Sequence, residues 1–122
     1  MQAKAQPDPR WTRRRTEKQR RLAHVSEFAD GAVLRTDSIV EVLERLIGPG
    51  DRVVLEGNNQ KQADFLARAL AQVDPARVHD INLIMPSVSL PEHLDLFERG
   101  IARRLDFAYA GGQSLRISQF LQ

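Results

Sequence analysis

The sequence predicts an α/β fold, a parallel sheet with helices on both faces. From residue 52 onward, short apolar runs alternate with segments of helical periodicity in the order strand, helix, strand, helix, strand, helix. The connections between these segments are short, and such alternation favours parallel strands joined by right-handed crossovers. The chain has 122 residues, of which 42% are hydrophobic, and this is enough for one modest core.

Residues 1–30 are predicted to form a basic arm ahead of a domain that spans residues 31–122. Residues 1–21 contain eight Lys or Arg against two acidic side chains, a net charge of +6, which leaves −4 for the rest of the chain. Such an arm could bind nucleic acid or an acidic partner, or lie over another part of a larger protein. Trp11 favours docking, because a free tail gains little from a large aromatic side chain.

Regular structure in the arm is expected to depend on packing. Pro7 and Pro9 favour extended or disordered backbone over the first ten residues. Residues 12–22 carry charges of nearly one sign and few apolar side chains, so a helix is expected there only if another surface packs against it. Gly31 then marks a turn, and residues 33–34 form either a short strand or a docked loop.

The first half of the domain should hold two helices around one strand. Residues 38–47 predict an amphipathic helix that begins with a Ser38 and Glu41 capping box and ends at residues 48–50, Gly-Pro-Gly. Val-Val-Leu at residues 53–55 predicts a strand buried on both faces. A polar loop and a second helix follow, and the inward face of this helix is expected to hold Ala63, Leu66, Ala67 and Leu70.

The second half continues the alternation. A strand over residues 78–85 should end at Pro86, and residues 89–92 predict a helix start capped by Ser89. A third strand over residues 105–109 and a final helix over 114–121 complete the pattern. The chain then ends in apolar side chains without a stop signal, which indicates a truncated domain. The helix that starts at Ser89 should carry Leu94, Phe97 and Ile101 inward, and Leu105, Phe107 and Tyr109 should share one face of the third strand.

Composition excludes several kinds of protein. The chain contains no cysteine, so disulfides and thiolate metal sites are excluded, and a cytoplasmic location is expected. No apolar run approaches the roughly 20 residues that a membrane span needs. None of the three histidines has metal-ligand spacing, so no metal site is expected, and His93 is predicted to be an exposed helix residue. No serine has a plausible histidine and acid partner for a hydrolase triad.

The polar loop after the first strand of the domain is the best candidate site. A glycine, three amides and a lysine stand there before a helix, as Gly57, Asn58, Asn59, Gln60 and Lys61. Such a set could bind a phosphate, a carboxylate or a thioester oxygen. The alternative is an amide-rich turn that caps its own helix. The loop matches neither the dinucleotide fingerprint nor a P-loop.

Two further positions lie at the same predicted edge of the sheet. Glu56 ends the first strand, where catalytic carboxylates often stand, but it could equally be a residue that holds the loop. Gly111 and Gly112 follow the third strand and permit close approach of a ligand or a neighbouring chain, or form a plain turn.

Three segments carry a resemblance to a known family. Residues 54–66 (VLEGNNQKQADFL), 90–98 (LPEHLDLFE) and 106–116 (DFAYAGGQSLR) resemble the α subunit of the biotin-independent malonate decarboxylases. The likeness runs from about Trp11 to the end of the chain. Because that subunit is several times longer, the chain resembles its amino-terminal portion only.

The resemblance implies a class I CoA-transferase-like, Rossmann-like fold and an acyl-carrier exchange, in which acetyl-carrier and malonate give malonyl-carrier and acetate. It also implies partners, namely an acyl-carrier subunit with a CoA-like prosthetic arm and the decarboxylase subunits, and no cofactor in this chain. In related CoA-transferases a glutamate attacks the thioester, and backbone N–H groups after the first strand steady the oxyanion. Gly57, Asn58, Asn59 and Gln60 match the place of that loop, although the CoA-transferases carry more glycine there.

The attacking glutamate of those enzymes lies later in the fold, so the nucleophile is expected beyond Gln122 and no such role passes to Glu56. The chain alone is therefore expected to be inactive. Two alternatives from other classes are a nucleic-acid-binding module that uses the basic arm and a stand-alone nucleotide-binding α/β domain.

Overall fold

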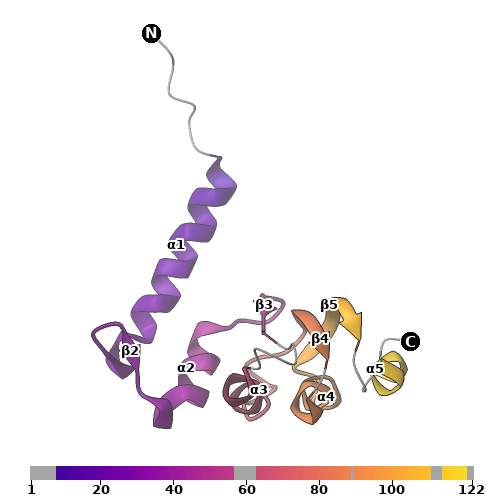
Figure 1. The fold of residues 1–122 in the computed structure, drawn as a ribbon. Coiled ribbons are helices and arrows are strands. Elements are labelled where there is room, and N and C mark those ends of the chain that lie inside the picture. The colour runs from indigo at the N-terminus through magenta and orange to yellow at the C-terminus, as the bar shows by residue number, and fades with distance from the viewer. Residues whose placement is uncertain (1–7, 57–62, 89, 111–113, 121–122) are drawn as a thin grey trace.

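The computed structural model describes residues 8–56, 63–88, 90–110 and 114–120 (Figure 1). Its helices are α1 (Pro9–His24), α2 (Ile39–Leu46), α3 (Asp64–Leu70), α4 (Pro91–Glu98) and α5 (Ser114–Phe120). Its strands are β1 (Ala29–Asp30), β2 (Val33–Leu34), β3 (Arg52–Val54), β4 (Ile81–Val88) and β5 (Ala102–Ala110). Short 3₁₀ turns at Ser26–Phe28 and Thr36–Ser38 flank the hairpin.

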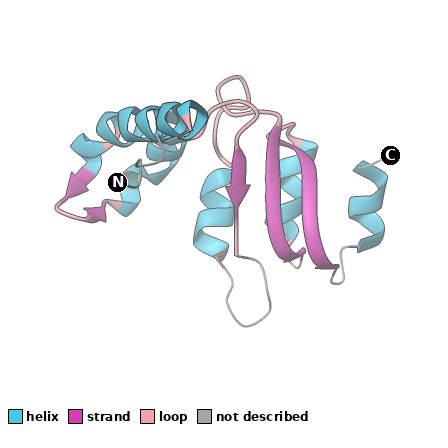
Figure 2. Ribbon diagram, turned by 90° about the horizontal axis from the view of Figure 1, so that it is seen from above, coloured by secondary structure: helices cyan, strands magenta, loops and turns pink. Residues whose placement is uncertain are grey.

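The main sheet is parallel, in the order β3-β4-β5, and helices flank it, so the predicted α/β class is confirmed. The helices α3 and α4 lie on the same face of this sheet (Figures 1 and 2). The expectation of helices on both faces therefore differs from the described part of the chain. The strand order explains the difference. Because the three strands are added in one direction, crossovers of one hand place their helices on one face.

The covered face of the sheet forms the core. Ile81, Leu83 and Met85 of β4 are buried there, together with Leu94 and Leu96 of α4. The predicted inward positions Phe97 and Ile101 are buried as well, and Gly100, with φ of 73°, closes α4. The inward face of α3 is confirmed at Ala67 and Leu70, whereas Leu66 is 40% exposed. Phe107 of β5 is also half-exposed.

The opposite face of the sheet is polar and open. Arg52, Asn82 and Arg104 stand beside one another across the three strands, and Val54, Ile84 and Asp106 form the next row. The side chain of Val54 is 74% exposed. The prediction that residues 53–55 form a strand buried on both faces is therefore wrong. A run of three apolar residues does not show that its strand lies at a sheet edge with one bare face.

The central strand β4 passes through Pro86, so the prediction that it ends there is wrong. The N–H of Asn82 donates to the carbonyl of Asp51 at 2.8 Å, and the carbonyl of Ile84 accepts from Leu55 at 3.0 Å. Even-numbered residues of β4 therefore direct their backbone groups toward β3, as alternation in a parallel pair requires. Pro86 is the next even position, and there β3 has already ended. A missing N–H is tolerated because no ladder hydrogen bond is lost.

The arm contains a helix that packs within the chain. Asp8 caps α1 by accepting the Arg10 N–H at 2.9 Å, and Pro9 occupies the first helical position, which suits proline. The first ten residues were predicted to be extended or disordered, and this is wrong at residues 9 and 10, which are helical. The packing that a helix required comes from α2, although the expected docking of Trp11 does not occur in the described chain, where it is 66% exposed.

A small second core links the arm to the domain. Val25 and Phe28, which follow α1, pack with Val42 of α2. The predicted turn at Gly31 has φ of 61° and closes the β1–β2 hairpin, so residues 33–34 form a strand. The Ser38 capping box is wrong, because the Ser38 hydroxyl bonds the Asp37 carboxylate at 3.3 Å instead of capping α2.

Candidate functional site

The carboxyl ends of the three parallel strands meet at one edge of the sheet, where α3, α4 and α5 begin (Figure 2). Ligands of open α/β sheets bind at this edge. The sequence-predicted residues Gly57, Asn58, Asn59, Gln60 and Lys61, and the pair Gly111 and Gly112, lie outside the described residues. They stay predictions, and the structure defines the backbone on either side of them.

The loop between β3 and α3 is closed by its own anchors. Leu55 is buried and its N–H donates to the Ile84 carbonyl at 3.0 Å, which ties the end of β3 to the sheet. The N–H of Ala63 donates to the carbonyl of Glu56 at 3.1 Å, so the two ends of the loop are joined directly. Glu56 was predicted, as one alternative, to hold the loop. Its backbone carbonyl does so, by accepting the Ala63 N–H. Its carboxylate is exposed and has no assigned role.

Two buried polar residues lie at the same edge. Ser87 is 6% exposed and belongs to β4, two residues further along the strand than its predicted end. The N–H of Leu90 donates to Nδ1 of His93 at 3.2 Å, so this side chain caps the start of α4. Burial lowers the pKa of His93, which keeps the ring neutral. The prediction that His93 is exposed is wrong, because a cap that faces the core is not visible in the sequence.

A groove runs between α1, α2 and the edge of β3, with a volume of about 1100 Å³. The carboxyl end of β3 and Leu66 in the first turn of α3 also line it. One end of the groove therefore borders the anchors of the candidate loop. The wall from α1 is basic, with Arg13, Arg14 and Lys18. Sequence periodicity gave no sign of this groove, because it forms between segments far apart in the chain.

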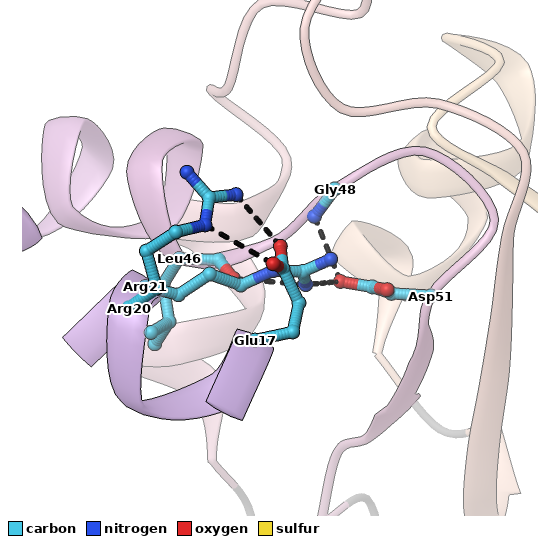
Figure 3. A network of polar contacts seen from close by, with 6 residues as sticks. All are labelled: Glu17, Arg20, Arg21, Leu46, Gly48 and Asp51. Atoms are coloured by element: carbon cyan, nitrogen blue, oxygen red, sulfur yellow. Dashed lines mark hydrogen bonds and ion pairs between the residues drawn. The ribbon is translucent and has the colours of Figure 1, made fainter. Parts of the chain in front are cut away.

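An ion-pair network fixes α1 beside this groove (Figure 3). Arg21 donates to the carboxylate of Asp51 at the start of β3 and, at 3.3 Å, to the carbonyl of Leu46 at the end of α2. The same Asp51 oxygen accepts the Gly48 N–H at 2.8 Å. These contacts raise the pKa of Arg21, chiefly through Asp51. The helix α1 is thus held beside the sheet by a specific side chain.

The described ranges contain neither a cluster of metal ligands nor a membrane-spanning helix. Among residues 8–56, 63–88, 90–110 and 114–120, no three His, Asp or Glu side chains gather as metal ligands would. In the same ranges, no helix has the length and apolar character needed to cross a bilayer.

Comparison with known proteins decides the family. The model of the family described as "Malonate decarboxylase, alpha subunit, transporter" matches residues 10–122. The chain belongs to the malonate decarboxylase α-subunit family. The resemblance stated from residues 54–66, 90–98 and 106–116 is thereby confirmed. The family match does not favour the two alternatives, a nucleic-acid-binding module and a stand-alone nucleotide-binding domain.

Individual relatives from the malonate decarboxylase α-subunit family show how much of a full-length subunit this chain covers. The chain is 42% identical over 113 residues to the "Acetyl-S-ACP:malonate ACP transferase" of Malonomonas rubra, covering 92% of this chain and 20% of the relative. The α subunit from Acinetobacter baumannii has a TM-score of 0.86 at 63% identity, over 90% of this chain and 20% of that one.

A "Pseudomonas malonate decarboxylase hetero-tetramer in complex with malonate" matches with a TM-score of 0.87 at 68% identity, over 93% of this chain and 21% of that one. The chain therefore spans about a fifth of the length of the relatives it matches.

Proposed function

We propose that the chain forms the amino-terminal part of the α subunit of a biotin-independent malonate decarboxylase. In this role it takes part in an acyl-carrier exchange: acetyl-S-carrier and malonate give malonyl-S-carrier and acetate. The observation that carries the proposal is the family match over residues 10–122, joined by a relative that is named as this transferase. The parallel sheet with its loops at one carboxyl edge supports it.

Within that reaction, the chain's contribution is a surface for the thioester. Negative charge that builds on a thioester oxygen needs hydrogen-bond donors held in place beforehand. We assign these donors to Gly57, Asn58, Asn59 and Gln60, which stand between the joined anchors Glu56 and Ala63. Lys61 would add a positive charge, and Gly111 and Gly112 would allow the substrate to approach the third strand.

The attacking carboxylate is not assigned to this chain. A carboxylate nucleophile must be desolvated and adjacent to its thioester, whereas Glu56 is exposed. We therefore place the nucleophile in the part of the subunit that this chain does not span. The remaining partners follow from the reaction: an acyl-carrier subunit with a CoA-like prosthetic arm, and the decarboxylase subunits that consume malonyl-carrier. We place this assembly in the cytoplasm, because the chain has no cysteine.

Reconstitution tests the function. The chain is coexpressed with the remaining part of a related α subunit, and the purified pair is incubated with acetylated carrier and malonate. Mass spectrometry of the intact carrier then follows replacement of acetyl by malonyl. We expect exchange with the pair and none with either part alone. A pair that assembles but leaves the carrier acetylated would exclude the proposed reaction.

A further inference from the structure

A second polar pocket lies at the edge of the sheet opposite the candidate loop. It has a volume of about 550 Å³ and is formed where the three strands begin, by Gly50, Arg52, Asp80, Asn82, Arg103 and Arg104. The strand β4 has 8 residues, so at about 3.3 Å per residue the two edges stand roughly 25 Å apart. A ligand in this pocket therefore occupies a different place from the site proposed for the thioester.

Two arginines of this pocket carry positive charges that no acidic side chain compensates. Arg52 and Arg104 flank Asn82 in one row across the three strands, and neighbouring strands lie about 4.8 Å apart. Both arginines are exposed, and within the described residues neither has a hydrogen-bond or ion-pair partner. Side chains of this length can bring their guanidinium groups together above the central strand.

The acidic side chains nearby are engaged elsewhere. The carboxylate of Asp80 is held by Nδ1 of His79 at 2.9 Å and lies 3.7 Å from the guanidinium of Arg103. The carboxylate of Asp106 accepts a hydrogen bond from the side-chain amide of Asn82 at 3.0 Å. Because the pocket is lined by three arginines and one aspartate, its own charge is positive.

The backbone around the pocket is tightly held. The Gly50 N–H donates to the His79 carbonyl at 3.2 Å, which joins the turn before β3 to the turn before β4. Asp80 has a φ of 55°, in the left-handed region that is unfavourable for residues other than glycine. Such a conformation persists only where the surrounding structure imposes it. The arginine row is therefore mounted on a rigid base, as a binding site requires.

We propose that the pocket around Arg52, Asn82 and Arg104 binds a phosphate group, either free or as part of a phosphate monoester. A phosphate group carries roughly two negative charges at neutral pH. Its tetrahedral oxygens can accept hydrogen bonds from both guanidinium groups at once, whereas one planar carboxylate suits a single guanidinium. The inference concerns a second site and does not depend on the proposed function.

Titration followed by NMR tests the proposal. The chain is titrated with inorganic phosphate at constant ionic strength, alone and coexpressed with the remaining part of a related α subunit. In both, the signals of Arg52 and Arg104 should shift to saturation, and acetate should bind at least about tenfold more weakly. Glycerol 3-phosphate in a parallel titration shows whether the monoester is preferred. Shifts without saturation, equal binding of acetate, or loss of binding in the pair would each overturn the proposal.

Single substitutions give a second readout. Arg52→Gln and Arg104→Gln should each weaken phosphate binding about tenfold, whereas Arg35→Gln removes the same charge from an exposed position elsewhere and should not. Asp80→Asn keeps a residue type that tolerates positive φ and removes the negative charge, so binding should tighten about threefold. Equal weakening by Arg35→Gln, or no tightening by Asp80→Asn, overturns the proposal. Acyl exchange by the paired variants should keep the parent rate, so the two proposals fail separately.

Discussion

Arg21 of α1 and Asp51 at the start of β3 form an ion pair that joins the basic helix to the sheet (Figure 3). Their side chains are 27% and 29% exposed, so water screens the pair less than it screens the outer pairs of α1. Asp51 is fixed in turn, because its carboxylate accepts the Gly48 N–H and its carbonyl accepts the Asn82 N–H. The position of α1 is therefore set by the residue that immediately precedes β3.

Arg21→Ala should release α1 and destabilise the chain by about 1 kcal/mol, the order expected for a partly screened, charge-assisted contact. Helical signal in circular dichroism should fall as well, since a helix rich in one charge needs its packing surface. Urea unfolding measures the stability change. Arg20→Ala removes the same charge from an exposed pair with Glu17 and should have little effect. Equal effects of the two substitutions would contradict the anchoring role.

Acid should loosen α1 in a defined range. Hydrogen bonds from Arg20 and then Arg21 lower the pKa of Glu17 from 4.5 to about 2. Because the folded pKa is the lower one, the contribution of Glu17 is complete above pH 4.5 and is lost as the pH falls toward 2. The carboxyl resonance of Glu17 measures this by NMR. Glu17→Gln should remove that part of the acid sensitivity, and an unchanged acid profile would count against the assignment.

Much of the fold could be predicted because its signals are local. The alternation after residue 52 gave three parallel strands, and Gly31 marked the turn that closes the hairpin. What could not be predicted depends on neighbours. Val54 is exposed because β3 is an edge strand, and β4 passes Pro86 because β3 has already ended beside it.

The candidate site, too, could be predicted only where its signals are local in the sequence. Its place at the carboxyl edge follows from the order of strands and helices, and could be read from the sequence. The backbone bond between Glu56 and Ala63, the burial of His93 and the groove beside β3 could not, because each needs distances between separate segments. Trp11 is 66% exposed in this chain, so its predicted docking onto another part of a larger protein stays a prediction.

His93 should make stability depend on pH below 6.5. Burial lowers its pKa from 6.5 in the folded state, so below that pH the unfolded chain takes up a proton that the folded chain resists. Stability is then complete above pH 6.5 and declines as the pH falls below it. Denaturation at several pH values measures this. His93→Gln keeps an acceptor for the Leu90 N–H and should flatten the profile, and a profile that stays steep would contradict the role.

Ala63→Pro should impair acyl exchange while leaving the chain folded. The substitution removes the N–H that donates to Glu56, and the φ of −85° at Ala63 is only slightly outside the range that proline adopts. One hydrogen bond of this kind is worth about 1 kcal/mol, so the chain should stay folded. Acyl exchange by the reconstituted pair should fall at least about tenfold, because donors must be held in place. Ala63→Ser keeps the N–H and serves as the control, and equal rates would show that this closure does not matter.

Carrier binding should depend on the exposed charges of α1. Arg13 and Arg15 are exposed residues of α1, and the contact of this helix with Asp51 is made by Arg21 instead. If an acidic carrier surface meets this helix, Arg13→Glu with Arg15→Glu should weaken binding about tenfold at low salt. The difference should shrink at high salt, because exposed charges are screened. Calorimetry across salt concentrations measures the affinity. Arg35→Glu with Arg99→Glu changes the charge equally at exposed sites elsewhere, and a matching loss there would attribute the effect to net charge and not to α1.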